Sequence, residues 1–171
     1  MASNQYNSFS RLLYVAPLIA MVGCVATQQT PRQEEVAFQS AEHRSFITKG
    51  ANTIKGQAFL RQQGGGVITC AGNEVIVIPQ TVFFHQAIGR ANSAIEIGRG
   101  MPSDAQGLIR RTRCDAQGNF SVADLPDGSW YVVTDVRWFV GYNQQGGKLV
   151  QAIDNLRGAT TTQALLTGEN R

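Results

Sequence analysis

Residues 130–140 (WYVVTDVRWFV) alternate between two sets of side chains with a period of two. That period places successive side chains on opposite faces of an extended strand. A Pro-Asp-Gly turn precedes the run, and residues 143–147 predict a hairpin loop before a return strand at 148–156. The more apolar set predicts the face that packs in the core: Trp130, Val132, Thr134, Val136, Trp138 and Val140.

Other segments between Gly- and Pro-rich turns also read as strands. Residues 54–61 alternate, residues 67–70 are rich in β-branched side chains, and residues 73–79 form an apolar run typical of a strand buried on both faces. Short strands are also expected at 120–122 and 159–166. The 18 glycines and the charged fraction of 16% agree with a turn-rich β protein, and the 43% hydrophobic content excludes a disordered chain.

The expected fold class is all-β, a small Greek-key β-sandwich over residues 54–166 with a polar tail at 167–171. Residues 80–107 interrupt the strand pattern and predict an irregular, partly helical insertion. Within it, several apolar residues recur at helix-like spacings, although Gly89 weakens that assignment. These residues are Phe84, Ala87, Ile88, Ala91 and Ile95.

Four short motifs resemble those of carboxypeptidase regulatory-like, or prealbumin-like, sandwich domains. They are a glycine-bearing first strand (IKGQAFL) with a second strand ending in Pro (EVIVIP), then DAQGNF, then LPDGSWYV. The resemblance covers residues 54–156, and its domains are mostly non-catalytic. It is carried by turn and core residues: Gly56, Val75, Val77, Pro79, Asp115, Gly118, Phe120, Leu125, Pro126, Gly128 and Tyr131.

Two chemically active branches of that fold are not favoured. The transthyretin-like hydrolases use clustered His and Arg residues and end in Tyr-Arg-Gly-Ser, whereas this chain ends in TGENR and has only His43 and His85. Pilin-like modules form Lys–Asn isopeptide bonds. Here Lys55, Asn155 and Glu74 match that motif poorly, so surface and turn roles are preferred for them.

Residues 1–23 resemble the signal peptide of a bacterial lipoprotein. Arg11 precedes an apolar run of 12 residues, 12–23. That run is too short for a spanning helix and suits a secretory signal. The sequence Met-Val-Gly-Cys at 21–24 resembles the lipobox, which implies cleavage before Cys24 and lipidation of Cys24. An ordinary signal peptide and a buried apolar helix are the alternatives.

The anchor implies where the protein is located, and the segment that follows it is expected to be a tether. Lipid on Cys24 implies a bacterial envelope protein bound to a membrane, and Val25 is compatible with the outer membrane facing the periplasm. Residues 24–53 lack strand alternation and predict a polar tether, with a short helix over 32–46 as the alternative.

Cys70 and Cys114 remain once Cys24 is assigned to the anchor. Both are expected near strand ends, and an exported chain with two remaining cysteines favours one disulfide. Two free buried thiols are the alternative. No cysteine and histidine spacing of a metal site occurs, so no metal and no cofactor are expected.

The charge and motif content limit the function. A net charge of +3, with 15 basic and 12 acidic residues, argues against nucleic-acid binding, and no phosphate loop or nucleophile elbow occurs. The preferred hypothesis is a non-catalytic sandwich that binds or scaffolds another envelope component, a protein or a glycan. The candidate partner surface is Tyr131, Phe139, Arg110, Arg111 and Arg113.

The alternative is an exported hydrolase or small-ligand binder with its site at residues 80–113. His85, Glu96, Arg99 and Asp104 carry that hypothesis. It requires His85 and Glu96 to converge in a concave pocket.

Overall fold

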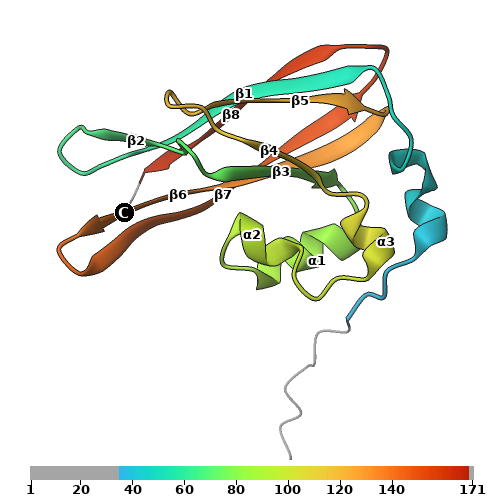
Figure 1. Cartoon of the computed structure of the whole chain (residues 1–171), viewed down its shortest axis with the longest axis horizontal. Helices are drawn as coiled ribbons and strands as arrows, with labels where there is room; N and C mark the ends of the chain where they lie inside the picture. The colour runs from blue at the N-terminus through green and yellow to red at the C-terminus, as the bar shows by residue number, and fades with distance from the viewer. Residues whose placement is uncertain (1–34, 170–171) are drawn as a thin grey trace, which may run out of the picture. The chain divides into compact units, whose positions relative to one another are not determined.

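The computed structural model describes residues 35–169 as two stacked β-sheets with short helices on one side (Figure 1). The predicted signal peptide (1–23), Cys24 and the last two residues lie outside the described residues. The strands are β1 (Asn52–Arg61), β2 (Val67–Thr69), β3 (Glu74–Pro79), β4 (Arg110–Arg113), β5 (Asn119–Leu125), β6 (Gly128–Val140), β7 (Asn143–Leu156) and β8 (Thr161–Glu169). The helices are η1 (Ser40–Phe46), α1 (Val82–Arg90), α2 (Ala94–Ile97) and α3 (Ser103–Gln106). The prediction of an all-β sandwich is confirmed.

Sheet A is organised around β1. β8 lies parallel to one edge of β1, with Thr53 opposite Thr161 and Arg61 opposite Glu169. The other edge pairs antiparallel with β5 and then, further along, with β2. Since β1 and β8 are the first and last strands in sequence, this sheet holds together the beginning and the end of the domain's sequence. Alternation along a single strand cannot reveal such a parallel pairing.

Sheet B has the strand order β4-β3-β6-β7, and all its pairs are antiparallel. The apolar composition of β3 follows from its position between the two cores. Val75 and Val77 face sheet A, whereas Ile76 and Ile78 face the helices, and all four are fully buried. The predicted burial of this strand on both faces is confirmed, and the strand ends at Pro79 as expected.

The main core lies between the sheets. Trp130, Val132 and Val136 of β6 are fully buried there, as the alternation predicts. The predicted core face does not continue to the end of the strand, since 59% of Val140 is exposed next to the β6–β7 turn. The hairpin turn also lies elsewhere than predicted. β6 and β7 are joined at Gly141 and Tyr142, and residues 143–147 belong to β7.

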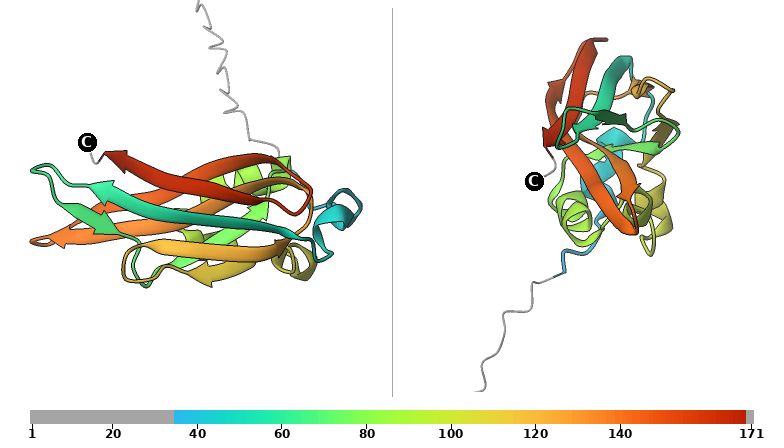
Figure 2. Two further views of the ribbon diagram at one scale, coloured as in Figure 1. Left: turned by 90° about the horizontal axis from the view of Figure 1, so that it is seen from above. Right: turned by 90° about the vertical axis from the view of Figure 1, so that its left-hand side faces the viewer.

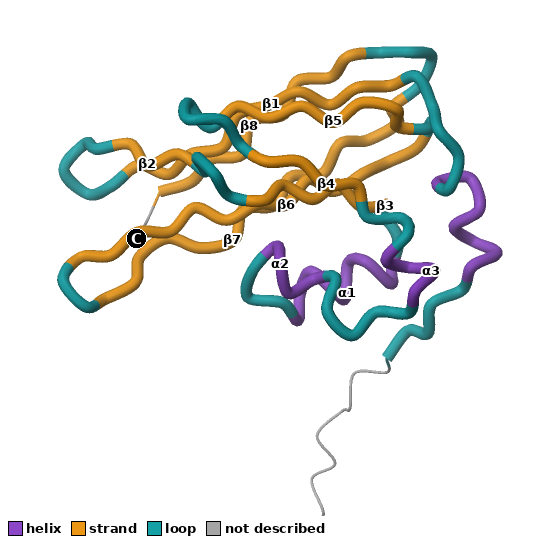
Figure 3. The backbone as a smooth tube through the Cα atoms, in the orientation of Figure 1, coloured by secondary structure: helices purple, strands orange, loops and turns teal. Residues whose placement is uncertain are grey.

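Helices α1 to α3 cover the outer face of sheet B (Figures 1 and 3). Phe84 and Ile88, four residues apart, face the sheet from α1 and form a second core with Ile76, Ile78 and Val133. Ile95 does not join this core and is 53% exposed. Between residues 35 and 169, no helix is long and apolar enough to span a bilayer.

Residues 35–46, here called the strap, pack against the helices instead of forming part of a tether. Phe38 and Phe46 contact the second core, and His43 is 1% exposed. The strap ends in η1, and β1 then begins at Asn52 rather than Ile54. Figure 2 shows η1 at one end of the sandwich, close to the helices. Residues 24–34 of the predicted tether lie outside the described residues.

Candidate functional site

A groove of about 1020 Å³ lies between the strap and the helices. Its floor comes from Phe83 and Ala87 of α1, one turn apart, and from Ala91, which directly follows the helix. Because alanine side chains are short, Ala87 and Ala91 leave the groove open above them. Other lining groups are Glu35, Ala37, Phe38 and Ser40 from the strap, Gln86 and Arg90 from α1, and Glu96, Ile97, Arg99, Met101, Pro102 and Asp104 beyond it.

Hydrogen bonds hold the strap along this groove. The backbone N–H of Val36 donates to Gln86 Oε1 at 3.2 Å, and Arg90 pairs with Glu35 at 2.9 Å. Across the groove, the Ser40 hydroxyl donates to Asp104 Oδ2 at 3.2 Å. Most of these groups are exposed, so each bond contributes little alone, but together they fix both walls.

His43 fastens the strap to α1. Its Nδ1 lies 2.8 Å from the carbonyl oxygen of Gln39, which can only accept, so Nδ1 carries the proton. In the neutral ring Nε2 then accepts from the Thr81 hydroxyl at 3.0 Å. The rings of Phe38 and Phe84 pack beside the imidazole, with centroids 4.7 and 5.8 Å away. With both nitrogens satisfied in an aromatic setting, this histidine has a structural role.

Charged side chains of sheet B position the far end of the helical layer. Asp135 accepts from the backbone N–H of Ala94 at 2.7 Å, where α2 begins. Arg137 donates to Asn92 O, and Lys148 donates to Ala91 O, where α1 has ended. Burial lowers the pKa of Lys148, and the nearby Asp135 carboxylate opposes that shift. The sequence had placed Asp135 and Arg137 on the face away from the core, without indicating that helices cover it.

The predicted partner surface is not one surface. Tyr131 is half-buried against the helices, while Phe139, eight residues further along the same face of β6, is 71% exposed. At about 3.3 Å per residue their Cα atoms are more than about 25 Å apart. Phe139 instead lies close in sequence to two other exposed apolar residues, Val140 and Tyr142, at the hairpin turn.

The three arginines of β4 bind backbone or acidic partners of the fold. Arg110 donates to the carbonyl oxygens of Gly107 and Phe46 at 3.0 and 3.1 Å, which ties η1 to the sheet. Arg111 pairs with Glu74 at 2.8 Å. Arg113 donates to Gly72 O at 2.9 Å. Arg111 and Arg113 still expose much of their side chains, but the cluster serves chiefly to hold β4 and its neighbours.

The residues of the hydrolase hypothesis separate into two places. Glu96, Arg99 and Asp104 line the groove, whereas His85 does not and bonds instead to the Tyr131 hydroxyl at 3.1 Å. Glu96 accepts from the backbone N–H of Asn92 at 2.8 Å. The expected convergence of His85 with Glu96 is therefore absent.

Lys55, Glu74 and Asn155 do not meet either. Lys55 lies on the outer face of sheet A, Glu74 pairs with Arg111 in sheet B, and Asn155 lies at the opposite end of sheet B from Glu74. Within residues 35–169, no group of three His, Cys, Asp or Glu side chains could hold a metal ion.

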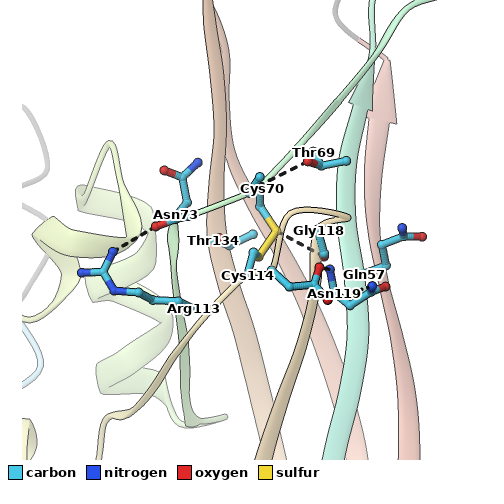
Figure 4. Close-up of a disulfide and its surroundings, with 12 residues drawn as sticks. Gln57, Thr69, Cys70, Asn73, Arg113, Cys114, Gly118, Asn119 and Thr134 are labelled. Carbon is cyan, nitrogen blue, oxygen red and sulfur yellow. Dashed lines mark hydrogen bonds between the residues drawn. A yellow bond between two sulfur atoms is a disulfide. The ribbon is translucent and has the colours of Figure 1, made fainter.

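Cys70 and Cys114 form the predicted disulfide (Figure 4). Their Cα atoms are 5.8 Å apart, within the normal range for such bonds. Both residues are buried between the sheets, and Cys70 Sγ lies 3.3 Å from the carbonyl oxygen of Gly118. The bond therefore links the end of β2 to the start of the DAQGNF turn. It does not border the groove.

A smaller hollow of about 490 Å³ lies on sheet A over Gly56. A Cβ at Gly56 would lie 2.4 Å from Ala164 O and 2.5 Å from the Phe120 ring, so only glycine fits there. Amides of Gln57, Asn119 and Gln163 border the hollow, together with Lys55. The glycine of the first-strand motif thus serves close packing of three strands.

Comparison with known proteins gives a fold neighbour and no family. No family model and no curated protein matches the chain. A solved structure from Pseudomonas aeruginosa, of a protein to which carbohydrate binding has been ascribed, is similar with a TM-score of 0.67 at 17% sequence identity. The match covers 79% of this chain and all of that one. At this identity the similarity shows a shared fold.

Proposed function

We propose that this protein is a lipoprotein of the bacterial envelope whose sandwich binds a glycan without catalysing its cleavage. The anchor would be lipid on Cys24, and the sandwich would belong with the carboxypeptidase regulatory-like domains. The groove between the strap and the helices carries the binding part of the proposal. The hydrolase alternative loses its support because His85 lies outside that groove.

The chemistry of the groove suits a sugar chain. Sugar rings pack their C–H faces on aromatic and apolar side chains, which Phe38, Phe83 and Met101 provide among the lining residues. Sugar hydroxyls take paired hydrogen bonds from planar polar groups, and Arg99, which lines the groove, forms no ion pair within residues 35–169. A glycan ligand also agrees with the activity ascribed to the structural neighbour.

The disulfide supports export. Disulfides persist in oxidising compartments such as the periplasm and are rare in the bacterial cytosol. The Cys70–Cys114 bond is buried in the core, so the folded domain is matched to such a compartment. This agrees with the signal sequence, which supplies the route.

Filling the groove tests the binding site. Ala37 lines the groove and is exposed, so Ala37→Trp blocks it from the strap without disturbing either core. Ala41, which is also exposed but lies on η1 outside the groove, provides the control Ala41→Trp. After screening on a glycan array, titration calorimetry with the best oligosaccharide should show at least roughly a tenfold weaker Kd for Ala37→Trp only. Absence of any bound glycan, or equal affinity of both variants, would refute the proposal.

The anchor has its own test. Labelled palmitate should enter the wild-type protein in a bacterial host, and Cys24→Ser should release an unlabelled protein into the soluble fraction. Identical soluble export of both forms contradicts the anchor while leaving glycan binding untouched.

A further inference from the structure

Three large apolar side chains are exposed together at the β6–β7 turn. Phe139 is 71% exposed, Val140 is 59% exposed and Tyr142 is fully exposed. We call these three residues the apolar tip. Isolated exposed apolar residues are common on protein surfaces, but three large ones within four positions at a tight turn call for an explanation. Polar residues could form the same turn and would keep the protein more soluble.

The tip is held in place by its turn. Val140 pairs with Asn143, which leaves Gly141 and Tyr142 as a two-residue connection. Gly141 has φ of +60°, as the first central residue of a type II′ turn requires. Tyr142 therefore occupies the apex of a regular hairpin. Its full exposure follows from the defined turn.

Trp138 braces the hairpin behind the tip. A Cβ at Gly146 would lie 2.8 Å from Cζ3 of Trp138, and Gly146 itself has φ of +79°. The glycine therefore lets the indole ring lie across the opposite strand. Trp138 also packs against the core between the sheets, so the last residues of β6 are connected to the folded domain.

No charged residue occurs near the turn. Residues 138–147 (WFVGYNQQGG) contain none, and neither do residues 62–66 (QQGGG) of the β1–β2 turn. Figures 1 and 3 show both turns at the end of the molecule opposite η1. The two turns themselves therefore offer no fixed charge to a partner, although Arg61 and Glu169 lie at the strand ends behind the β1–β2 turn. The attraction of the β6–β7 turn must come from apolar and aromatic surface.

We propose that the apolar tip inserts into the interfacial region of a lipid bilayer. Phe, Tyr and Trp are the residues that favour this region, because their rings are apolar and Tyr and Trp retain a polar group for the headgroups. The absence of charge removes the main penalty for insertion. The tip would be a membrane contact separate from the anchor on Cys24.

The size and shape of the tip favour a bilayer over a protein partner. Its three side chains present a few hundred square ångströms at most, since an aromatic residue buries about 150–250 Å². A stable protein interface buries about 800 Å² on each partner and needs complementary shape. A bilayer accepts a convex apolar wedge without such complementarity. A single insertion of this kind gives reversible rather than permanent binding.

The test uses the full chain with Cys24→Ser, so that lipidation plays no part. This protein should float with vesicles of phosphatidylethanolamine and phosphatidylglycerol, equally at low and high salt. Changing Phe139 and Tyr142 together to Ser should lower the bound fraction by about tenfold. The matched control is Val82→Ser with Ile95→Ser, which removes apolar residues that are 65% and 53% exposed elsewhere on the surface.

Trp138 supplies a second readout, because Trp130 is fully buried and its emission should stay constant. Vesicles with brominated acyl chains should quench Trp138 in the Cys24→Ser protein and not in the tip variant. Failure of Cys24→Ser to bind vesicles, or equal binding by the tip variant, overturns the proposal. So does a dimer in solution that the tip variant abolishes, because the tip would then be a protein interface. None of these results depends on glycan binding.

Discussion

Removing the Cys70–Cys114 disulfide should destabilise the domain more than any surface change. The bond spans 44 positions of sequence and encloses β3, helices α1 to α3 and β4. On the loop-entropy relation, a cross-link over such a loop lowers the free energy of folding by about 4 kcal/mol. That amount corresponds to a fall in Tm on the order of 10 °C for a domain of this size.

The perturbation is the double variant Cys70→Ala/Cys114→Ala, compared with the oxidised wild type. Alanine is preferred to serine because it places no hydroxyl in the region where both cysteines are buried. Urea unfolding followed by the fluorescence of the fully buried Trp130 gives the free energy of unfolding. The variant should unfold at lower urea with a steeper slope, because its unfolded chain exposes more surface.

A reductant provides the control. It should lower the stability of the wild type to near that of the variant and leave the variant unchanged. Loss of less than about 1 kcal/mol would show that the relation does not describe this loop. Labelling of two thiols in the protein without reductant would contradict the bond itself.

Two further changes probe particular hydrogen bonds. Asn52 is fully buried, donates to Leu125 O and Asp127 Oδ1, and accepts from the Thr160 N–H. Asn52→Ala should therefore lower the free energy of unfolding in urea by about 3 kcal/mol, whereas Asn143→Ala, at an exposed position, should change it little. Equal stability of the two variants would contradict this. The backbone N–H of Asn119 and its side-chain amide lower the pKa of Asp115 below 3.8. Because the folded pKa is the lower one, this contribution to stability is present above the unfolded pKa and is lost as the pH falls through the folded value. Asp115→Asn should therefore show a smaller loss of Tm between neutral and acid pH, and an unchanged pH dependence would exclude the effect.

Local patterns predicted the sandwich because each strand records which of its faces is buried. β3 follows this rule on both faces, and Trp130, Val132, Thr134 and Val136 of β6 follow it on the core face. The rule fails where burial comes from distant segments. Asp135 alternates like a solvent-facing residue, yet it is 9% exposed because α2 begins on top of it.

The candidate site was harder to predict for the same reason. The groove exists only because the strap folds back onto α1, and no local periodicity marks residues 35–46. The cluster of Phe38, His43 and Phe46 in an otherwise polar segment was the one available signal. Similarly, Gly146 and Gly147 favoured a hairpin turn, although Gly146 instead makes room for the Trp138 ring.

The parallel pairing of β1 with β8 has a consequence for the order of events during synthesis. Thr53 lies opposite Thr161, so the central strand of sheet A cannot pair along its second edge until β8 is available, more than 100 residues later. Contacts between residues so far apart in sequence form slowly, because a long loop must close first. A chain leaving the ribosome, or emerging from a membrane pore with its amino terminus first, would therefore hold β1 with one edge open until the final strand arrives. The sandwich would therefore be completed only after β8 has emerged.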